Sequence, residues 1–452
     1  MVDYDNNRSN LEEISKMHES HGRTLLREAV RLNDIKEKDL VQRLLEDATK
    51  NIQQSIDIGG KRVGLCDLMG EIYFEKEDYE SADKWFSFEL KEYPENTKVI
   101  SSLGYCALEL KSFSIALNRF RQAFESDPNN PDNLYNVAFC LTQLGRFNEA
   151  QFNLENYFRT FDVNEDSEAH CLLGICYKEN EDKKKAIISF RIAIKLDPEG
   201  NRAYHPFGVL LRDEGRIEEA DKFLQKALNR ENIPVDREER DVNLLLDAGK
   251  TKLLLGDYDN ANTLFLDACE IAPQIKEIHY LLGISYYQIA RNKKELKKKG
   301  MLEDDDDYKM EFSNAADTFH TAKHMGFDEK DLDLYLGISY FEIGDYYSAE
   351  HFFKICITEN DCHSKAHYFL ALIYEDDDNI TTAFEYSKKA FDSDPDNEDI
   401  ANLYYKLLLS LNENEKESGD CSPHVGKFDL RNRLANQRNL GPPDTLGDAQ
   451  KN

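Results

Sequence analysis

Residues 68–94 read LMGEIYFEKEDYESADKWFSFELKEYP and contain one complete copy of a motif that recurs along the chain. The spaced residues of this copy are Gly70, Tyr73, Ala82, Phe86 and Pro94. The alanine recurs at nine places: Ala82, Ala116, Ala150, Ala186, Ala220, Ala261, Ala315, Ala349 and Ala383. Successive alanines are 34, 34, 36, 34, 41, 54, 34 and 34 residues apart, so one spacing accounts for five of the eight intervals. Such a fixed period predicts a repeat architecture.

Other positions of the motif recur with the alanine. Most copies have a glycine twelve residues before it, and many have a phenylalanine four residues after it. Between them run apolar residues at helical spacing, first Leu103, Ala107 and Leu110, then Ala116 and Phe120. Small residues on both helices let the two backbones approach closely. One helical hairpin cannot bury its own faces, so we expect the hairpins to stack on one another.

This order of Gly, Tyr, Ala, Phe and Pro over 34 residues resembles the tetratricopeptide repeat family. The resemblance covers residues 63–397, about three quarters of the chain. It implies an all-α fold, a right-handed superhelical solenoid of about nine helix-turn-helix repeats with helical caps. In this family the first helices of the repeats line a concave groove, so the resemblance also implies that partner segments bind there.

The segments outside the array are expected to be a polar N-terminal segment over 1–21 and a helical pair or cap over 22–60. A capping helix is expected over 398–411, and a disordered tail over 412–452. The array itself contains an insertion near 291–310, where we expect the first helix of repeat seven to extend before an acidic loop. This insertion is either an extended helix with a solvated loop or a docking or regulatory element.

Pro206 breaks the helical pattern of repeat five, two residues before Gly208. Proline inside a helix costs on the order of 3 kcal/mol, so the helix should start late or kink there. The irregularity is either a structural accommodation or a device that shapes the groove.

We transferred to this chain the positions that face the groove in the family. Many of the residues at these positions are aromatic, and those in the central repeats include several cations. The candidate partner-binding residues are Tyr105, Tyr135, Phe139, Ile175, Lys178, Arg202, His205, Arg212, Lys250, Tyr280, Tyr287, Phe341 and Tyr368. Aromatic side chains are common anchors in protein interfaces. The basic centre predicts a partner segment with hydrophobic anchors and an acidic group. The alternative is that the cations pair with neighbours such as Glu179 and Asp213.

Composition narrows the classes of function. The chain has 452 residues and a formal net charge of −30, which disfavours a whole-surface role in nucleic-acid binding. No stretch is apolar enough for membrane insertion, the first ten residues do not form a secretory signal, and nine scattered cysteines fit free thiols. These features predict a cytoplasmic protein, with the nucleus not excluded.

No catalytic or metal-binding motif stands out in the sequence. His320 with His324, and His363 with His367, have the i, i+4 spacing of a metal pair, but neither has a third ligand. We therefore expect no enzyme activity, no cofactor and no metal. The favoured function is an interaction scaffold or adaptor for protein or peptide segments in a multi-protein complex. The alternatives are a chaperone or targeting receptor that holds a peptide signal, and a nucleic-acid-sensing repeat protein.

Overall fold

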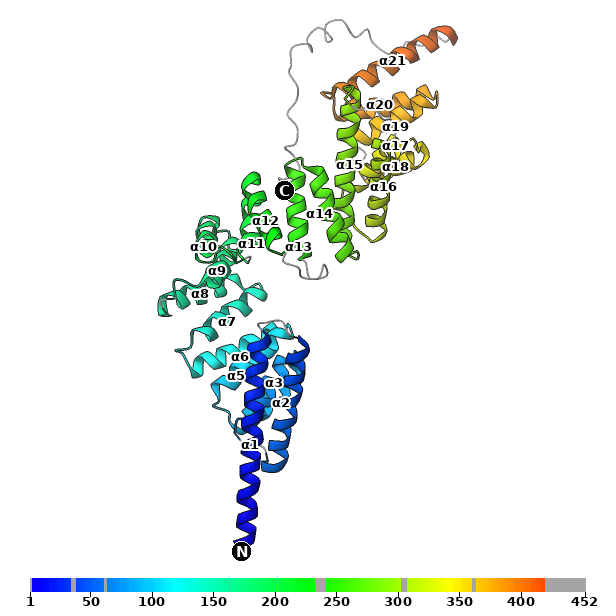
Figure 1. Ribbon diagram of the computed structural model, residues 1–452. Coiled ribbons are helices and arrows are strands. Elements are labelled where there is room, and N and C mark those ends of the chain that lie inside the picture. Colours follow the sequence, from blue (N-terminus) through cyan, green and yellow to red (C-terminus); the bar gives the residue numbers. More distant parts are fainter. Residues whose placement is uncertain are drawn as a thin grey trace. The chain divides into compact units, whose positions relative to one another are not determined.

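The computed structural model describes residues 2–33, 38–60, 63–161, 163–200, 202–231, 241–301, 307–359 and 363–418 (Figure 1). All regular secondary structure in these ranges is α-helical, which confirms the predicted all-α fold. The chain divides into two compact units, Met1–Ile271 and Ala272–Asn452. In each unit the helices pack mainly against their neighbours along the chain.

In the described residues, unit 1 holds helices α1 to α14. They are α1 (Val2–Asn33), α2 (Lys38–Gly59), α3 (Leu65–Glu75), α4 (Tyr79–Glu92), α5 (Thr97–Glu109), α6 (Phe113–Ser126), α7 (Pro131–Gln143), α8 (Phe147–Phe161), α9 (Ser167–Glu179), α10 (Lys183–Leu196), α11 (Tyr204–Asp213), α12 (Ile217–Glu231), α13 (Val242–Leu254) and α14 (Tyr258–Ile271).

Unit 2 holds the other helices of the described residues. They are α15 (Lys276–Lys298), α16 (Asp307–His324), α17 (Leu332–Ile343), α18 (Tyr346–Glu359), α19 (Ser364–Asp376), α20 (Ile380–Ser393) and α21 (Glu398–Ser418). From α3 to α20 the helices form consecutive hairpins, and each second helix carries one of the nine recurring alanines. All nine alanines are fully buried.

A contact between glycine and a large side chain holds seven of the nine hairpins closed, whereas α7 and α19 have Ala138 and Ala371 at this position. A Cβ atom added to Gly249 on α13 would lie 2.4 Å from the Phe265 ring on α14. Gly70, Gly104, Gly174, Gly283 and Gly337 meet their phenylalanines in the same way. In the hairpin of α11 and α12, Leu224 takes the place of the phenylalanine against Gly208. The recurring glycine is therefore required because the partner ring occupies the space that a side chain would need.

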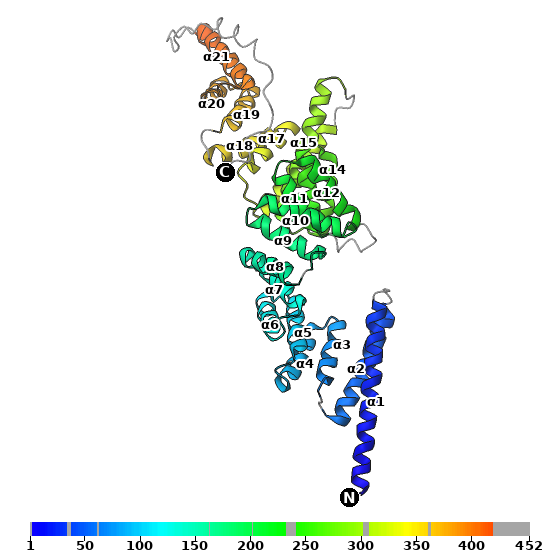
Figure 2. The same cartoon turned by 90° about the vertical axis from the view of Figure 1, so that its left-hand side faces the viewer.

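The two ends differ from the boundaries expected from the sequence. Helix α1 begins at Val2 rather than at residue 22, and α2 lies beside it (Figure 2). The reason is that α2 packs along α1 as far back as Ser15, whose buried hydroxyl lies 2.9 Å from the Ser55 carbonyl oxygen. The polar residues of 11–21 occupy the exposed side of a helix. At the other end α21 continues to Ser418, and residues 419–452 of the expected tail lie outside the described residues.

Pro206 is accommodated by a short first helix. Helix α11 begins at Tyr204 and has 10 residues, whereas the other first helices of unit 1 have 11 to 13. Pro206 is thus in the first turn, where a backbone N–H would have no partner four residues earlier. The helix starts late, and the ring causes no kink in a helix interior.

The insertion lengthens α15. This helix has 23 residues and ends at Lys298, and Gly300 follows with a φ of 70°. The extension packs on its neighbours, because Lys293 contacts Glu311 of α16 at 3.0 Å and Lys294 contacts Glu342 of α17. Residues 302–306, which include most of the expected acidic loop, lie outside the described residues.

The described cysteines are all free thiols, and all but Cys269 are buried. Burial raises the pKa of the Cys106 and Cys140 thiols to about 12, so these side chains are neutral packing residues near pH 7. Among the described helices, none combines the length and the apolar character needed to span a lipid bilayer.

Candidate functional site

The first helices of neighbouring hairpins lie side by side. In unit 1, α7 contacts α9 and α11 contacts α13, and in unit 2, α15 contacts α17. The sequence-predicted binding residues all belong to these first helices or to the turn before α11. We refer to the surface that these helices present, taken in each unit by itself, as the first-helix face. The structure shows which of the predicted side chains are accessible on it.

Tyr105 is the most accessible aromatic of the predicted set. Its side chain is 37% exposed, its ring centroid lies 5.1 Å from that of Phe120, and its hydroxyl accepts a hydrogen bond of 2.9 Å from Asn136 Nδ2. Tyr135 and Phe139 on α7 are half-buried and pack on the core of α5 to α12. Burial raises the pKa of Tyr135, so its hydroxyl stays protonated at any physiological pH.

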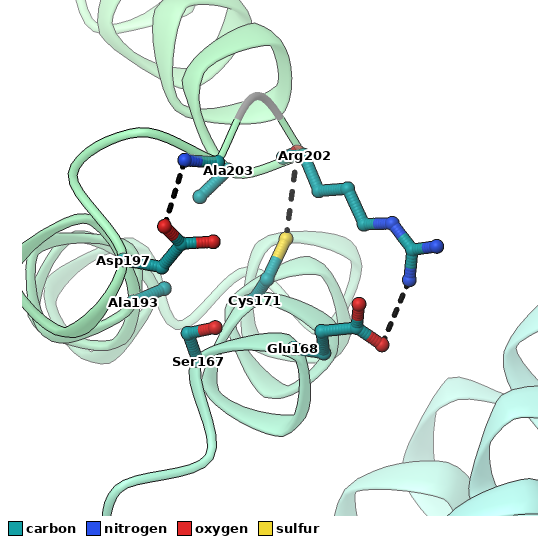
Figure 3. A pocket seen from close by; sticks show the side chains of 8 residues that line it. Ser167, Glu168, Cys171, Ala193, Asp197, Arg202 and Ala203 are labelled. Carbon is teal, nitrogen blue, oxygen red and sulfur yellow. Dashed lines mark hydrogen bonds and ion pairs between the residues drawn. The ribbon is translucent and has the colours of Figure 1, made fainter. Parts of the chain in front are cut away.

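Lys178 and Arg202 are both paired with carboxylates. Lys178 Nζ lies 3.1 Å from Glu179, and Arg202 Nη1 lies 2.8 Å from Glu168 on α9. Figure 3 shows Arg202 reaching Glu168 at the edge of a small pocket of about 120 Å³. The buried Cys171 lies on the floor of this pocket, with its Sγ 3.5 Å from the Arg202 carbonyl oxygen. Ile175 is half-buried one turn further along α9.

His205 and Arg212 converge on one carboxylate, Asp247 of α13. His205 Nε2 lies 2.8 Å from Asp247 Oδ2, and Arg212 Nη1 lies 2.8 Å from Asp247 Oδ1. Burial alone would raise the Asp247 pKa, but the hydrogen bonds from His205 and Arg212 outweigh it and hold this pKa below its usual value. Arg212 also contacts Asp213 at 3.4 Å. The group ties α11 to α13 across 35 residues of sequence.

The pairing of Lys178 with Glu179 and of Arg212 with Asp213 is the alternative that the sequence left open. The central cations on the first-helix face therefore face acidic neighbours, and this region is not a surface of surplus positive charge. Lys250 is half-buried on α13. The sequence analysis selected Lys250 and missed Asp247, three residues earlier on the same helix, although Asp247 is the centre of the network.

In unit 2, Tyr287 differs from the prediction. Its side chain is only 6% exposed, and its ring centroid lies 5.8 Å from that of Phe312 and 5.0 Å from that of Tyr335. It is a core residue, because the neighbouring helices α16 and α17 both place an aromatic ring against it. A partner cannot reach Tyr287 in the folded unit.

The other predicted aromatics of unit 2 are half-buried. Tyr280 packs on Phe327 with ring centroids 4.8 Å apart, and Phe341 packs on Phe369 at 5.1 Å. Tyr368 packs beside the core formed by α19, α20 and α21. Each of these rings is therefore partly accessible to solvent and partly packed against its neighbours.

A larger cavity opens between α3 and α5. It has a volume of about 310 Å³ and is lined by Glu71, Phe74, Glu75, Phe86, Ser102 and Tyr105. Tyr105 was among the predicted site residues, whereas Glu75, Ser102 and Phe86 were not. Ser102 could have been found because it lies one turn before Tyr105 on the same helix. Phe86 follows the packing motif, and nothing in the sequence signals that its ring also closes a cavity.

His363 and His367 belong to the structure around α19, whereas His320 and His324 are both exposed on α16. His363 caps α19 by accepting a hydrogen bond from the Ala366 backbone N–H, and His367 is fully buried. In the part of the chain that the structure describes, no three His, Cys, Asp or Glu side chains come together as a metal site.

Models of known protein families match several segments of the helical array. A family model described as Tetratricopeptide repeat matches residues 120–152, and a second model of the same description matches residues 167–199, 202–233 and 364–397. The match over 202–233 spans the hairpin of α11 and α12. These matches show that the chain contains tetratricopeptide repeats.

The relatives share only part of their length with this chain. It is similar to the probable UDP-N-acetylglucosamine–peptide N-acetylglucosaminyltransferase SPINDLY of Hordeum vulgare, with 26% identity over 118 residues, which are 26% of this chain and 12% of that protein. It is similar to anaphase-promoting complex subunit 3 of Schizosaccharomyces pombe, with 24% identity over 258 residues, covering 51% of this chain and 38% of that protein. The chain thus spans less than half the length of both relatives.

Among solved structures, a tetratricopeptide repeat protein from Parabacteroides merdae aligns with 59% of this chain and 99% of its own chain. The sequence identity is 17% and the TM-score is 0.46.

Proposed function

We propose that this protein is a non-catalytic scaffold that holds segments of partner proteins on its first-helix face during assembly of a multi-protein complex. The observation that carries the proposal is the arrangement of the first helices. They lie side by side and present partly exposed aromatic rings, such as Tyr105, Tyr135 and Phe139, to solvent. Rigid aromatic side chains that are already packed on one edge lose little entropy when a partner covers the other edge.

The relatives support a role in assembly. The name of anaphase-promoting complex subunit 3 identifies that protein as a member of a multi-subunit complex. Tetratricopeptide hairpins supply a long surface with a small core, and such repeat surfaces are suited to extended partner segments. The partner is a protein or peptide, because the net charge of −30 repels the phosphates of nucleic acids.

Affinity purification of the whole chain with two matched double variants tests the proposal. Tyr105→Ala with Arg202→Ala removes an exposed ring and a paired arginine from the first-helix face. Phe152→Ala with Arg121→Ala removes a 63% exposed ring and an arginine paired with Glu149 from second helices α8 and α6. Quantitative mass spectrometry should show at least a tenfold loss of the specific partners for the first variant only.

The contrary result is equally clear. Partners that stay bound to the Tyr105 and Arg202 variant, or that leave only with the Phe152 and Arg121 variant, would place the interaction on the second helices and refute the proposal. Thermal unfolding of both variants checks that each is folded.

A further inference from the structure

The last described helix, α21, has apolar side chains on its outer side. It lies beside α20 (Figure 1), and its buried Leu403 and Leu407 form a core with residues of α19 and α20. Leu409 lies on the other side of the helix and is 52% exposed, while Leu408 and Tyr405 beside it are half-buried. The terminal element of a repeat array needs a polar outer face, because no further hairpin covers it. The outer side of α21 lacks this character.

The aromatic rings next to this outer side are already held in place. The Tyr405 ring centroid lies 5.7 Å from that of Phe391 on α20. The Tyr404 ring stacks on Phe391 at 4.7 Å and on Phe384 at 5.6 Å. Because α20 fixes these rings, a segment that covers α21 would order few additional side chains, and little entropy would be lost.

The beginning of α21 is acidic. Asp396, Glu398 and Asp399 are exposed there, and none of the three forms an ion pair with a described cation. Lys406 is the only cation in residues 396–412, and it pairs with Glu375 of α19 at 2.7 Å. A segment that covers α21 from its last turn to its first turn would therefore be favoured if it ended in cations.

A segment of this composition follows α21 in the same chain. Residues 427–440, which lie outside the described residues, read KFDLRNRLANQRNL. They hold four cations and one carboxylate, in a chain whose formal net charge is −30. The cations are Lys427, Arg431, Arg433 and Arg438, and the large apolar residues are Phe428, Leu430, Leu434 and Leu440. The segment thus combines the two features that α21 would recognise.

The connection is long enough for the chain to turn back on α21. Eight residues, 419–426, separate α21 from this segment, and at about 3.3 Å per residue they can span roughly 26 Å. Helix α21 has 21 residues and is about 31 Å long. The segment would cover about 21 Å as a helix and more if extended. When it runs antiparallel to α21, its leucines come near Leu409 and Arg438 comes near the first turn.

We propose that residues 427–440 fold back and cover the outer side of α21. The leucines of this segment lie against Tyr405 and Leu409, and Arg438 lies against Glu398. The segment supplies the polar outer layer that α21 lacks, so it acts as the cap of the array in unit 2. Of the tail that we expected to be disordered, only this segment becomes ordered. The inference does not depend on the proposed function, because the outer side of α21 is not the first-helix face.

Hydrogen exchange of the full-length chain tests the apolar part of this contact. Leu430→Asp with Leu434→Asp should release the segment and raise the exchange rate of residues 398–411 about tenfold, since the outer side of α21 then faces water. Leu446→Asp with Ala449→Asp is the matched control. It adds the same two charges to the tail outside the segment and should leave this rate unchanged.

A charge swap tests the polar part. Arg438→Glu should raise the exchange rate of residues 398–411 several-fold in the natural background, because it places a carboxylate beside Glu398. In the background of Glu398→Arg, the same substitution should lower the rate. Lys451→Glu, which reverses a cation outside the segment, should have no effect in either background.

Three results would overturn the inference. The first is an exchange rate of residues 398–411 that does not change in Leu430→Asp with Leu434→Asp. The second is an equal rise in the matched control, which would indicate general charge repulsion. The third is protection of α21 that increases with protein concentration, since a second copy of the chain would then cover this helix. Unchanged exchange of α17 and α18 shows that the array stays folded in each variant.

Discussion

At the scale of single residues, six of the nine hairpins depend on a glycine that leaves room for an aromatic ring. Gly249→Ala would place a methyl group 2.4 Å from the Phe265 ring, which is itself fully buried. Overpacking of this kind costs typically 1–3 kcal/mol, partly offset by the higher helix propensity of alanine, about 1 kcal/mol. We expect hydrogen exchange to show a loss of about 1–2 kcal/mol in the stability of α13 and α14.

Leu254→Ala on the same helix is the control for Gly249→Ala. Leu254 is 54% exposed, so its truncation should change the exchange of α13 by less than about 0.5 kcal/mol. Equal effects of the two substitutions would show that the glycine contact does not limit packing.

Asp247 links two repeats through charge. Its folded-state pKa is lower than its unfolded value, so the ionised carboxylate contributes stability above the unfolded pKa, about 4, that is lost as the pH falls through the folded pKa. Asp247→Asn should cost about 1–3 kcal/mol near pH 7, because Arg212 then keeps a half-buried charge without its main partner. Hydrogen exchange of α11 and α13 should be measured for Asp247→Asn and for the natural protein from pH 7 down to pH 3. The difference in stability between the two proteins should become smaller below about pH 4.

Asp213→Asn serves as the comparison at the same arginine. Asp213 is 46% exposed and contacts Arg212 at 3.4 Å, so its loss should cost well under 1 kcal/mol at any pH. A difference for Asp247→Asn that stayed constant down to pH 3 would contradict a charge-based role.

At the scale of elements, the start of α11 is set by Pro206. Because this proline occupies the first helical turn, Pro206→Ala should change stability by less than about 1 kcal/mol. Val209→Pro, three residues further into the same helix, should cost about 3 kcal/mol or more, because it removes an interior hydrogen bond. Chemical denaturation followed by circular dichroism distinguishes the two, and similar losses would show that Pro206 is under strain where it stands.

The extent of the elements was only partly predictable. The motif placed the hairpins correctly, because the recurring alanine marks every close contact within a hairpin and glycine with phenylalanine marks most of them. It did not place the start of α1 at Val2. The residues before Gly22 are mostly polar and so predicted a solvated segment, and only the structure shows that α2 packs against this part of α1. Gly22 itself allows this approach, as an added Cβ would lie 2.6 Å from Ile52 Cδ1.

At the scale of the whole molecule, stability in a repeat array is close to a sum of hairpin and neighbour terms. Phe353→Ala in unit 2 removes a fully buried ring that packs on Phe369 at 5.2 Å and should cost about 3–5 kcal/mol locally. The rate of hydrogen exchange should rise most in α17, α18 and α19. This increase should become smaller with distance along the array. Helices α3 to α6 should exchange as in the natural protein.

Tyr347→Ala is the matched control for Phe353→Ala, since Tyr347 lies on the same helix and is 86% exposed. It should leave exchange in α17 to α19 unchanged. A uniform rise across both units after Phe353→Ala would mean that the chain unfolds as one cooperative block rather than repeat by repeat.

The sequence by itself determined the repeat, the helical hairpins and the buried alanines, because contacts within a hairpin join residues at a fixed spacing. It did not determine which first-helix side chains stay accessible. Tyr105 and Tyr287 were both predicted binding residues, but the first borders a cavity and the second is covered by Phe312 and Tyr335. Exposure and charge pairing, as at Arg212 and Asp247, depend on side chains from other helices, and only the tertiary structure brings those together.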